Sequence, residues 1–179
     1  MHLDVKPDNI LVTKDGVCKL GDFGLAVTAD SLEDGREGDC RYLAPELVDR
    51  SADFTLQPSA DMFSVGMLAF ELVTQLEVPS AGSEWHRLRD GHSRKFQSLS
   101  LRYSLSLFTE CQSLFFSFVP ARQYMMGVGS EELVNLIVSL LSPNPRDRPS
   151  AAEVTSLAAR MPHQYSHPDV KSLLETKSS

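Results

Sequence analysis

A predicted helix from Met62 to about Gln75 is the feature that most restricts how this chain can fold. Ser59 is expected as its N-cap, with Asp61 in its first turn. A helix with so little polar surface has to be covered by other elements. We therefore expect it at the centre of a helical domain, for which 179 residues and 42% hydrophobic content are sufficient. Its apolar residues leave almost no polar face and are Phe63, Val65, Met67, Leu68, Phe70, Leu72 and Val73.

Shorter helical segments are predicted before and after this helix, at residues 46–48, 83–90, 131–141 and 150–161. The last one begins with the capping box Ser150 to Glu153. Residues 93–128 have neither a strand period nor a helix period. We interpret them as an atypical insert, either a lineage-specific loop or the product of an incorrect gene model. Residues 162–179 are expected to form a polar tail.

A β-hairpin is predicted near the N-terminus, with strands at Ile10–Val12 and Val17–Leu20. An Asp-Gly pair between the strands is a strong signal for a tight turn. A hairpin brings its open ends together, and here those ends are Asn9 and Asp22. The two residues are therefore expected side by side. The predicted fold class is mainly α with a small β-hairpin.

Composition argues against several functions. A net charge of -7 disfavours binding of nucleic acid or of an anionic membrane through bulk charge. The most apolar long stretch, 101–119, is interrupted by Arg102 and Glu110, so we expect no clear membrane-spanning segment. The three cysteines lie far apart in the sequence, which indicates a reducing compartment and neither a zinc site nor a disulfide framework.

Three short motifs follow one another along the chain: His2-Leu3-Asp4-Val5-Lys6-Pro7-Asp8-Asn9, then Asp22-Phe23-Gly24, then Ala44-Pro45-Glu46. In this order they resemble the catalytic loop, the metal-binding turn and the end of the activation segment of a protein kinase. The resemblance covers residues 1–161 apart from the insert, and it implies the C-terminal lobe of the protein kinase-like α+β fold. A glycine-rich phosphate loop and a strand lysine have no counterpart in these residues. The resemblance therefore implies that the N-terminal lobe is missing and that the chain is inactive by itself.

The resemblance assigns chemistry to four residues. Asp4 is expected to orient the substrate hydroxyl and accept its proton, and Lys6 to bind the transferred phosphate of ATP. Asn9 and Asp22 match the two ligands of Mg²⁺, and both present the oxygen atoms that this ion prefers. The implied cofactors are ATP and Mg²⁺. Taken singly, Asp4 and Lys6 would fit an ordinary surface pair, and only the ordered set of motifs favours a kinase.

Other residues are expected to support this site without taking part in the chemistry. His2 is expected as a structural prop, and Gly24 in a turn that needs an unusual backbone angle. Glu46 matches the glutamate that pairs with an arginine near the end of a kinase domain, and Arg148 fits that partner. Asp61 resembles the helix aspartate that accepts backbone N–H groups of the catalytic loop.

Further details are similar to the Wee1/Myt1 family, and closer to its membrane-associated Myt1 branch. Leu3 replaces the usual arginine, which argues against activation by loop phosphorylation. Asp39 stands where serine/threonine kinases usually carry threonine, and Trp85 begins the run Trp-x-x-Leu-Arg-x-Gly. The resemblance implies a protein substrate, namely a cyclin-dependent kinase phosphorylated on inhibitory residues so that mitotic entry is delayed. It also implies a protein of the nucleus or cytoplasm, since no counterpart of the Myt1 membrane anchor follows the domain.

Two other interpretations stay open at this point. In the first interpretation, the chain is a noncatalytic, truncated kinase lobe that binds partner proteins through its helices. Binding of ATP and Mg²⁺ by the 179-residue chain would count against that interpretation. The other alternative is a gene fragment without an independent role, which sequencing of the transcript would decide.

Overall fold

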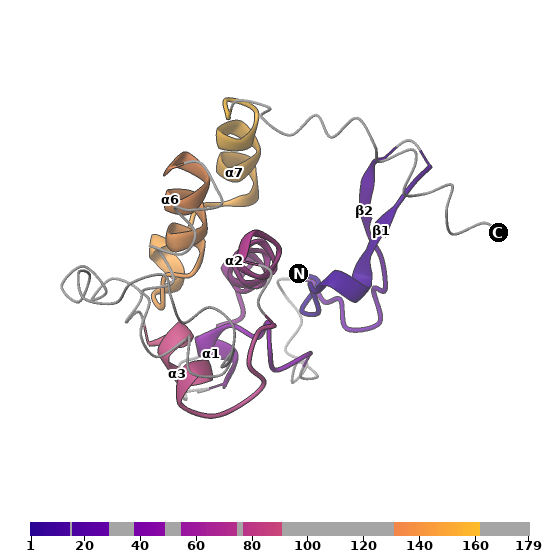
Figure 1. The fold of residues 1–179 in the computed structure, drawn as a ribbon. Coiled ribbons are helices and arrows are strands. Elements are labelled where there is room, and N and C mark those ends of the chain that lie inside the picture. The colour runs from indigo at the N-terminus through magenta and orange to yellow at the C-terminus, as the bar shows by residue number, and fades with distance from the viewer. Residues whose placement is uncertain (15, 29–37, 49–54, 75–76, 91–130, 162–179) are drawn as a thin grey trace, which may run out of the picture.

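The computed structural model describes residues 1–14, 16–28, 38–48, 55–74, 77–90 and 131–161. In these parts of the chain the helix α2 lies at the centre, with shorter helices on one side and a hairpin on the other (Figure 1). The helices are α1 (Pro45–Val48), α2 (Ser59–Thr74), α3 (Ser83–Arg89), α6 (Glu131–Leu140) and α7 (Ala151–Ala158), with 3₁₀ turns η1 (Pro7–Asn9) and η4 (Pro145–Asp147). The strands are β1 (Ile10–Val12) and β2 (Cys18–Leu20). The predicted mainly helical fold with one small hairpin is confirmed.

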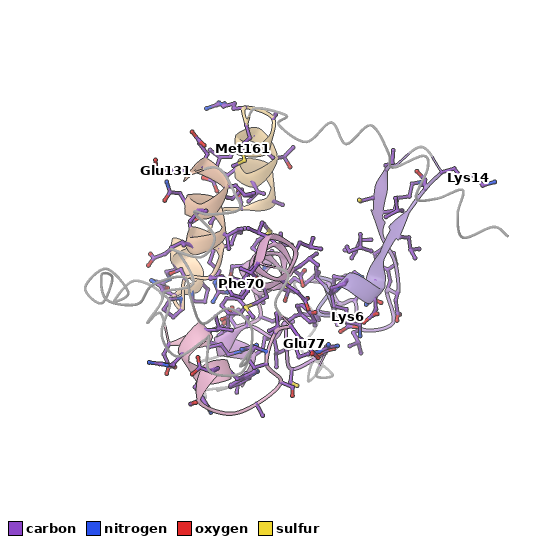
Figure 2. The ribbon with its side chains drawn as sticks, in the orientation of Figure 1. Lys6, Lys14, Phe70, Glu77, Glu131 and Met161 are labelled. Carbon is purple, nitrogen blue, oxygen red and sulfur yellow. The ribbon has the colours of Figure 1, made fainter. Side chains whose placement is uncertain are left out.

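The central helix α2 carries most of the core, as its apolar sequence predicts. Phe63 and Met67 are fully buried, and Phe70 is 1% exposed among the side chains at the centre of the molecule (Figure 2). A Cβ atom at Gly66 would lie 2.8 Å from Leu140 Cβ, so the absence of a side chain lets α2 approach α6 closely. The burial is not complete, because Leu72 is 66% exposed.

The start of α2 differs from the prediction. Ser59 is the first residue of the helix, and its hydroxyl caps nothing: among the described residues the buried Ser59 Oγ has no hydrogen-bond partner. The first turn is closed by backbone groups, since the Ala60 N–H donates to Gln57 O at 3.0 Å and the Met62 N–H to Pro58 O at 3.4 Å. The cap prediction was therefore wrong because carbonyls just before the helix face its first turn.

The hairpin has the predicted strands and an antiparallel register in which Ile10 faces Leu20 and Val12 faces Cys18. Its turn is closed by hydrogen bonds at Thr13, and Gly16 has the positive φ of 78° that favours glycine in such a turn. Most side chains of both strands are exposed, including the large apolar Leu11. The hairpin is thus joined to the rest of the fold mainly at its open end (Figure 1).

α1, α3 and α6 begin and end within one residue of their predicted positions, whereas α7 ends at Ala158, three residues before the predicted end. The capping box of α7 is present, since Ser150 N–H donates to Glu153 Oε2 at 2.7 Å and Glu153 N–H to Ser150 Oγ at 3.4 Å. The insert 93–128 and the tail 162–179 lie outside the described residues. No helix in the described ranges has both the length and the apolar character needed to cross a membrane.

Candidate functional site

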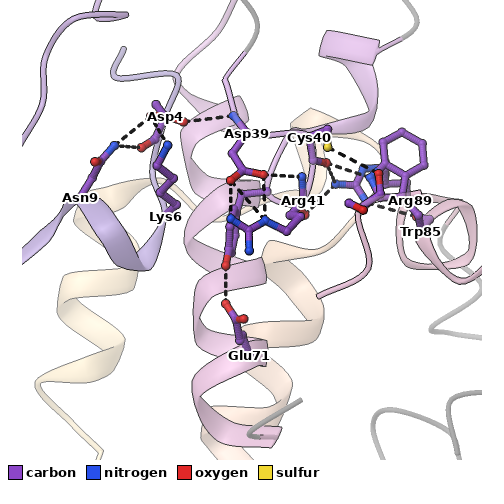
Figure 3. A network of polar contacts seen from close by, with 11 residues as sticks. Asp4, Lys6, Asn9, Asp39, Cys40, Arg41, Glu71, Trp85 and Arg89 are labelled. Atoms are coloured by element: carbon purple, nitrogen blue, oxygen red, sulfur yellow. Dashed lines mark hydrogen bonds and ion pairs between the residues drawn. The ribbon is translucent and has the colours of Figure 1, made fainter. Parts of the chain in front are cut away.

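The Asp4 carboxylate is the centre of the candidate site. It is only 9% exposed and accepts hydrogen bonds from three groups (Figure 3). Lys6 Nζ lies 2.8 Å from Oδ2, the Asn9 amide donates to the same oxygen at 2.9 Å, and the Asp39 backbone N–H donates to Oδ1 at 3.1 Å. Two of these donors come from the first nine residues and the third from a segment about thirty-five residues later. The tertiary fold therefore brings the three donors together around the Asp4 carboxylate.

Charge at this site is set by those contacts. Burial raises the pKa of Asp4, but hydrogen bonds from Lys6, Asp39 and Asn9 outweigh it, so the pKa lies below its ordinary value. The same hydrogen bond to Asp4 raises the pKa of Lys6. Both groups are therefore charged at neutral pH. A carboxylate that is ionised and fixed in place can accept a proton from a substrate hydroxyl.

Asp61 of α2 fixes the backbone just before Asp4. Its carboxylate accepts the His2 N–H at 2.7 Å and the Leu3 N–H at 2.8 Å, one on each oxygen. Leu3 has a φ of 66°, a left-handed conformation that costs a bulky residue roughly 1–3 kcal/mol. The two hydrogen bonds offset that strain. They also connect the central helix directly to the loop that carries Asp4.

His2 joins the same loop to the open end of the hairpin. The Asp4 N–H donates to His2 Nδ1 at 3.3 Å, so Nε2 carries the proton and donates to Gly21 O at 2.9 Å. The imidazole packs edge-on against the ring of Phe23, with ring centroids 5.2 Å apart. Each ring nitrogen of His2 therefore holds the backbone of a different segment.

Asn9 and Asp22 lie at adjoining ends of the hairpin. The Gly21 N–H donates to Asn9 O at 2.8 Å, which brings their backbones together. The Asn9 amide group donates to the carbonyl and to the carboxylate of Asp4, so its Oδ1 points away from Asp4 (Figure 3). The Asp22 carboxylate is exposed, and in the described part of the chain it meets only the Gly24 N–H. Two hard oxygen donors are thus left available, a set that fits a divalent cation such as Mg²⁺.

The unusual backbone angle of this turn is on Asp22 and not on Gly24, which corrects the prediction. Asp22 has a φ of 57°, whereas the φ of Gly24 is outside the left-handed region. Asp22 tolerates this angle because its own Oδ1 accepts the Gly24 N–H at 3.1 Å, an Asx-type turn. A Cβ atom at Gly24 would lie 3.1 Å from that oxygen, so glycine is favoured here for space.

Glu46 and Arg148 form a bidentate ion pair 102 residues apart in the sequence. Arg148 Nη1 lies 2.6 Å from Oε1 of Glu46, and Nη2 lies 2.8 Å from Oε2. The Arg148 side chain is 0% exposed and also donates to the carbonyls of Ser59, Ser142 and Pro143. The pair ties α1 and the start of α2 to the segment after α6.

Sequence reasoning missed the contribution of residues 38–42. A Cβ atom at Gly38 would lie 2.3 Å from Leu3 O, so only glycine fits where this segment crosses the Asp4 loop. The Asp39 carboxylate pairs with Arg41, whose Nη2 lies 2.6 Å from Oδ2, and the pair lowers the pKa of Asp39. The Tyr42 hydroxyl donates to Glu71 of α2, and burial together with that contact raises the pKa of Tyr42 (Figure 3). The sequence signal that could have indicated this segment was Gly38, a glycine directly before the charged residues Asp39 and Arg41.

Comparison with known proteins matches residues 1–158 to the protein kinase domain family. The membrane-associated tyrosine- and threonine-specific cdc2-inhibitory kinase wee-1.3 of Caenorhabditis elegans is 35% identical over 157 residues, which are 86% of this chain and 18% of that protein. The mitosis inhibitor protein kinase wee1 of Schizosaccharomyces pombe is 34% identical over 157 residues, 86% of this chain and 16% of that protein. The mitosis inhibitor protein kinase mik1 of the same yeast is 46% identical over 93 residues, 51% of this chain and 15% of that protein. The chain thus spans less than a fifth of the length of these relatives, and its resemblance to the Wee1/Myt1 family is confirmed.

Proposed function

This chain belongs to the protein kinase domain family, and from that premise we propose that residues 1–161 are the C-terminal lobe of a Wee1/Myt1-like kinase. The reaction is transfer of the γ-phosphoryl group of ATP to a hydroxyl group of a protein. Kinase domains use ATP and a divalent metal ion, and catalysis by the protein consists mainly of positioning and charge neutralisation. The observation that carries the proposal is the buried Asp4 carboxylate, held by three donors beside the ammonium group of Lys6.

Asp4 accepts the proton of the substrate hydroxyl. Oδ2 is held by Lys6 and Asn9 and Oδ1 by the Asp39 N–H, so the carboxylate cannot rotate away from the acceptor. Its lowered pKa keeps it deprotonated at neutral pH. A fixed, ionised acceptor is the requirement for a general base in this position.

Lys6 stabilises the charge that develops on the transferred phosphoryl group. An ammonium group has three N–H donors, and Asp4 takes one of them at 2.8 Å. As far as the described residues show, two donors are left for phosphate oxygens, and the Lys6 side chain is partly exposed, which lets it reach a bound ligand.

Asn9, through its Oδ1 atom, and Asp22, through its carboxylate, would hold Mg²⁺. The fixed orientation of the Asn9 amide supports this role, because its N–H donors are committed to Asp4. Bound Mg²⁺ supplies positive charge to the phosphate groups of ATP.

The proposed substrate is a cyclin-dependent kinase. The support comes from the relatives, whose names describe cdc2-inhibitory and mitosis-inhibitor kinases. Phosphorylation of this cyclin-dependent kinase would then restrain entry into mitosis. Leu3 supports the comparison further, since it is buried in the core and offers no cation to a phosphorylated loop.

The test is phosphate transfer by a kinase in which this sequence follows the nucleotide-binding lobe of a Wee1-type relative. The acceptor is a cyclin-dependent kinase, and the readout is incorporation of labelled phosphate. Asp4→Asn and Asp22→Asn are each expected to lower kcat by at least about a thousandfold. Asp147→Asn is the matched control, because Asp147 is exposed and lies in η4, away from the site. Activity that survives Asp4→Asn or Asp22→Asn would refute the proposal.

A noncatalytic, protein-binding role is the second candidate function. The observation in its favour is the exposed apolar surface of the hairpin region, where Phe23 is 66% exposed and Leu11 and Val17 are also exposed. Calorimetry with the 179-residue chain separates the two candidates. Binding of ATP and Mg²⁺ that disappears in Asp22→Asn favours the kinase and counts against the second role.

A further inference from the structure

The segment 40–43 has an unusual way of satisfying its backbone. It forms neither a strand nor a helix up to Ala44, yet each of its four consecutive carbonyl groups accepts a hydrogen bond from a side chain. The donors come from only three residues, Ser64 of α2 and Trp85 and Arg89 of α3. Buried carbonyl groups outside regular structure need such partners, and here one residue supplies most of them.

Arg89 is that residue. Its Nε donates to Leu43 O at 2.9 Å, and its Nη2 donates to Cys40 O at 2.8 Å and to Arg41 O at 2.9 Å (Figure 3). Its Nη1 donates to Trp85 O at 3.1 Å, within its own helix. The guanidinium carbon lies 3.9 Å from the centroid of the Trp85 ring, which makes a cation–π contact.

Within the described ranges the Arg89 charge is buried without a counter-ion. Arg89 is 3% exposed, and no carboxylate among the described residues forms an ion pair with it. Burial lowers the pKa of Arg89 to about 10, so it stays protonated at neutral pH. A buried cation without a partner is expensive, and an apolar residue would fill the same space more favourably. We therefore explain the presence of an arginine at this position by its forked guanidinium, which binds several backbone carbonyls at once.

The same segment reaches the candidate active site at its other end. The Asp39 N–H donates to Asp4 Oδ1, and Asp39 O accepts the Tyr42 N–H at 3.0 Å in the turn that Arg89 holds. Arg89 is thus connected to Asp4. It binds the carbonyls of Cys40 and Arg41, Cys40 is joined to Asp39 by a peptide bond, and the Asp39 N–H donates to Asp4.

We propose that Arg89 is a positioning residue for phosphoryl transfer. It anchors the backbone of residues 40–43 so that the Asp39 N–H stays on the Asp4 carboxylate while the acceptor protein is bound. Catalytic use of the anchored segment rests on the proposed function. The anchoring of the backbone by Arg89 does not depend on the proposed function, and it can be measured separately.

Hydrogen exchange measured by mass spectrometry on the 179-residue chain tests the anchoring. In Arg89→Met, peptides that cover residues 39–43 are expected to exchange about tenfold faster or more, which corresponds to the loss of one charged hydrogen bond. Arg89→Lys is expected to exchange nearly as fast, because one ammonium cannot reach the spread-out carbonyls of Cys40, Arg41 and Leu43. Peptides from α6 are expected to keep their exchange rates.

Two variants calibrate this measurement. Arg87→Met is the matched control: Arg87 lies on the same helix but is exposed and pairs only with Glu84 among the described residues, so no change is expected. Ser64→Ala removes the one side-chain donor to Tyr42 O in the described part of the chain and is expected to accelerate exchange less than Arg89→Met. Quenching of Trp85 by acrylamide gives a second local readout, since the sequence contains one tryptophan.

The catalytic consequence is tested in the complete kinase described above. Arg89→Met and Arg89→Lys are expected to lower kcat for the protein substrate about 10- to 100-fold, the size of effect expected for a small misplacement of a reacting group. KM for ATP is expected to stay within about twofold, because among the described residues the segment 39–43 donates to Asp4 and forms no hydrogen bond with Asn9 or Asp22.

Unchanged exchange at residues 39–43 in Arg89→Met would overturn the proposal. Equal acceleration in α6 and in residues 39–43 in both Arg89 variants would also overturn it, because Arg89 would then be a general stabiliser of the fold. A kcat that is unaffected in both variants would overturn the catalytic part. Activity that persists in Asp4→Asn would instead refute the proposed function, and the exchange result would still decide the anchoring.

Discussion

The two sides of α2 are built in different ways. Toward α6 the contacts are apolar: Gly66 packs against Leu140, and Met62 shares a small cluster with Leu136. Toward the Asp4 loop and residues 38–43, single hydrogen bonds add to the apolar packing of Leu3, Tyr42 and Leu43. Asp61 holds the loop before Asp4, Ser64 holds Tyr42 O, and Glu71 accepts the Tyr42 hydroxyl. We call these the apolar side and the polar side of α2.

This difference means that the two sides fail differently. Apolar contacts are many and weak, so the loss of one side chain lowers stability in proportion to the buried volume that is lost. On the polar side each donor or acceptor has an assigned partner, so one substitution leaves a specific group unsatisfied. Mutations on the apolar side should change the free energy of unfolding, whereas mutations on the polar side should change the geometry of the site.

The largest effect on stability is expected on the apolar side. Phe70→Ala should lower the free energy of unfolding by about 3–5 kcal/mol, because it opens a cavity in the core. Chemical denaturation followed by circular dichroism measures this loss. Leu72→Ala is the control on the same helix, since Leu72 is mostly exposed and its loss should cost less than about 0.5 kcal/mol. Equal losses in the two variants would contradict the assignment of Phe70 to the core.

The next largest effect on stability is expected from the Glu46–Arg148 ion pair, which belongs neither to the apolar side nor to the polar side of α2. Glu46→Gln should lower the free energy of unfolding by about 3 kcal/mol, because Arg148 would keep a fully buried charge without its carboxylate. The measurement is the same denaturation experiment. Glu84→Gln, which removes an exposed partner of Arg87, should cost at most about 0.5 kcal/mol. If both substitutions cost the same, the Glu46–Arg148 pair does not have the buried role that its geometry indicates.

Gly38→Ala should affect the polar side specifically. The new Cβ would meet Leu3 O at 2.3 Å, so the backbone of one segment has to move. We expect a moderate loss of stability of about 1–3 kcal/mol. We also expect faster hydrogen exchange at Asp39 and, in the complete kinase, a loss of kcat larger than the loss of stability explains. A variant with normal Asp39 exchange would show that the close approach of Gly38 and Leu3 is not needed.

The smallest expected effect is a dependence on pH. The pKa of Asp39 is lowered mainly by its hydrogen bond with Arg41, so the pair stabilises the folded state above the ordinary aspartate pKa of 3.8. That contribution should be lost as the pH falls through the lower pKa of the folded state. The difference in unfolding free energy between the unaltered chain and Asp39→Asn should be about 0.2–1 kcal/mol near neutral pH. It should approach zero at strongly acidic pH, and a difference that grows on acidification would contradict the sign of the shift.

Local patterns in the sequence predicted the regular elements well. The hairpin follows from two short apolar runs around Asp-Gly, and α7 follows from Ser150 and Glu153, because these signals act within a few residues. The burial of α2 follows from its apolar composition. The order of the motifs was sufficient to indicate the kinase family, since it depends on residue identity and not on geometry.

The tertiary structure decided how the candidate site is held together. Two local predictions were also wrong. Backbone carbonyls just before α2 close its first turn in place of Ser59, and the Asp22 side chain lets Asp22 adopt the left-handed angle expected at Gly24. Residue types alone also cannot show that Gly38 touches Leu3 or that Arg89 gathers the carbonyls of residues 40–43. Those contacts join segments about 35 to 50 residues apart, and which polar groups meet is determined only when these segments pack together in the folded chain.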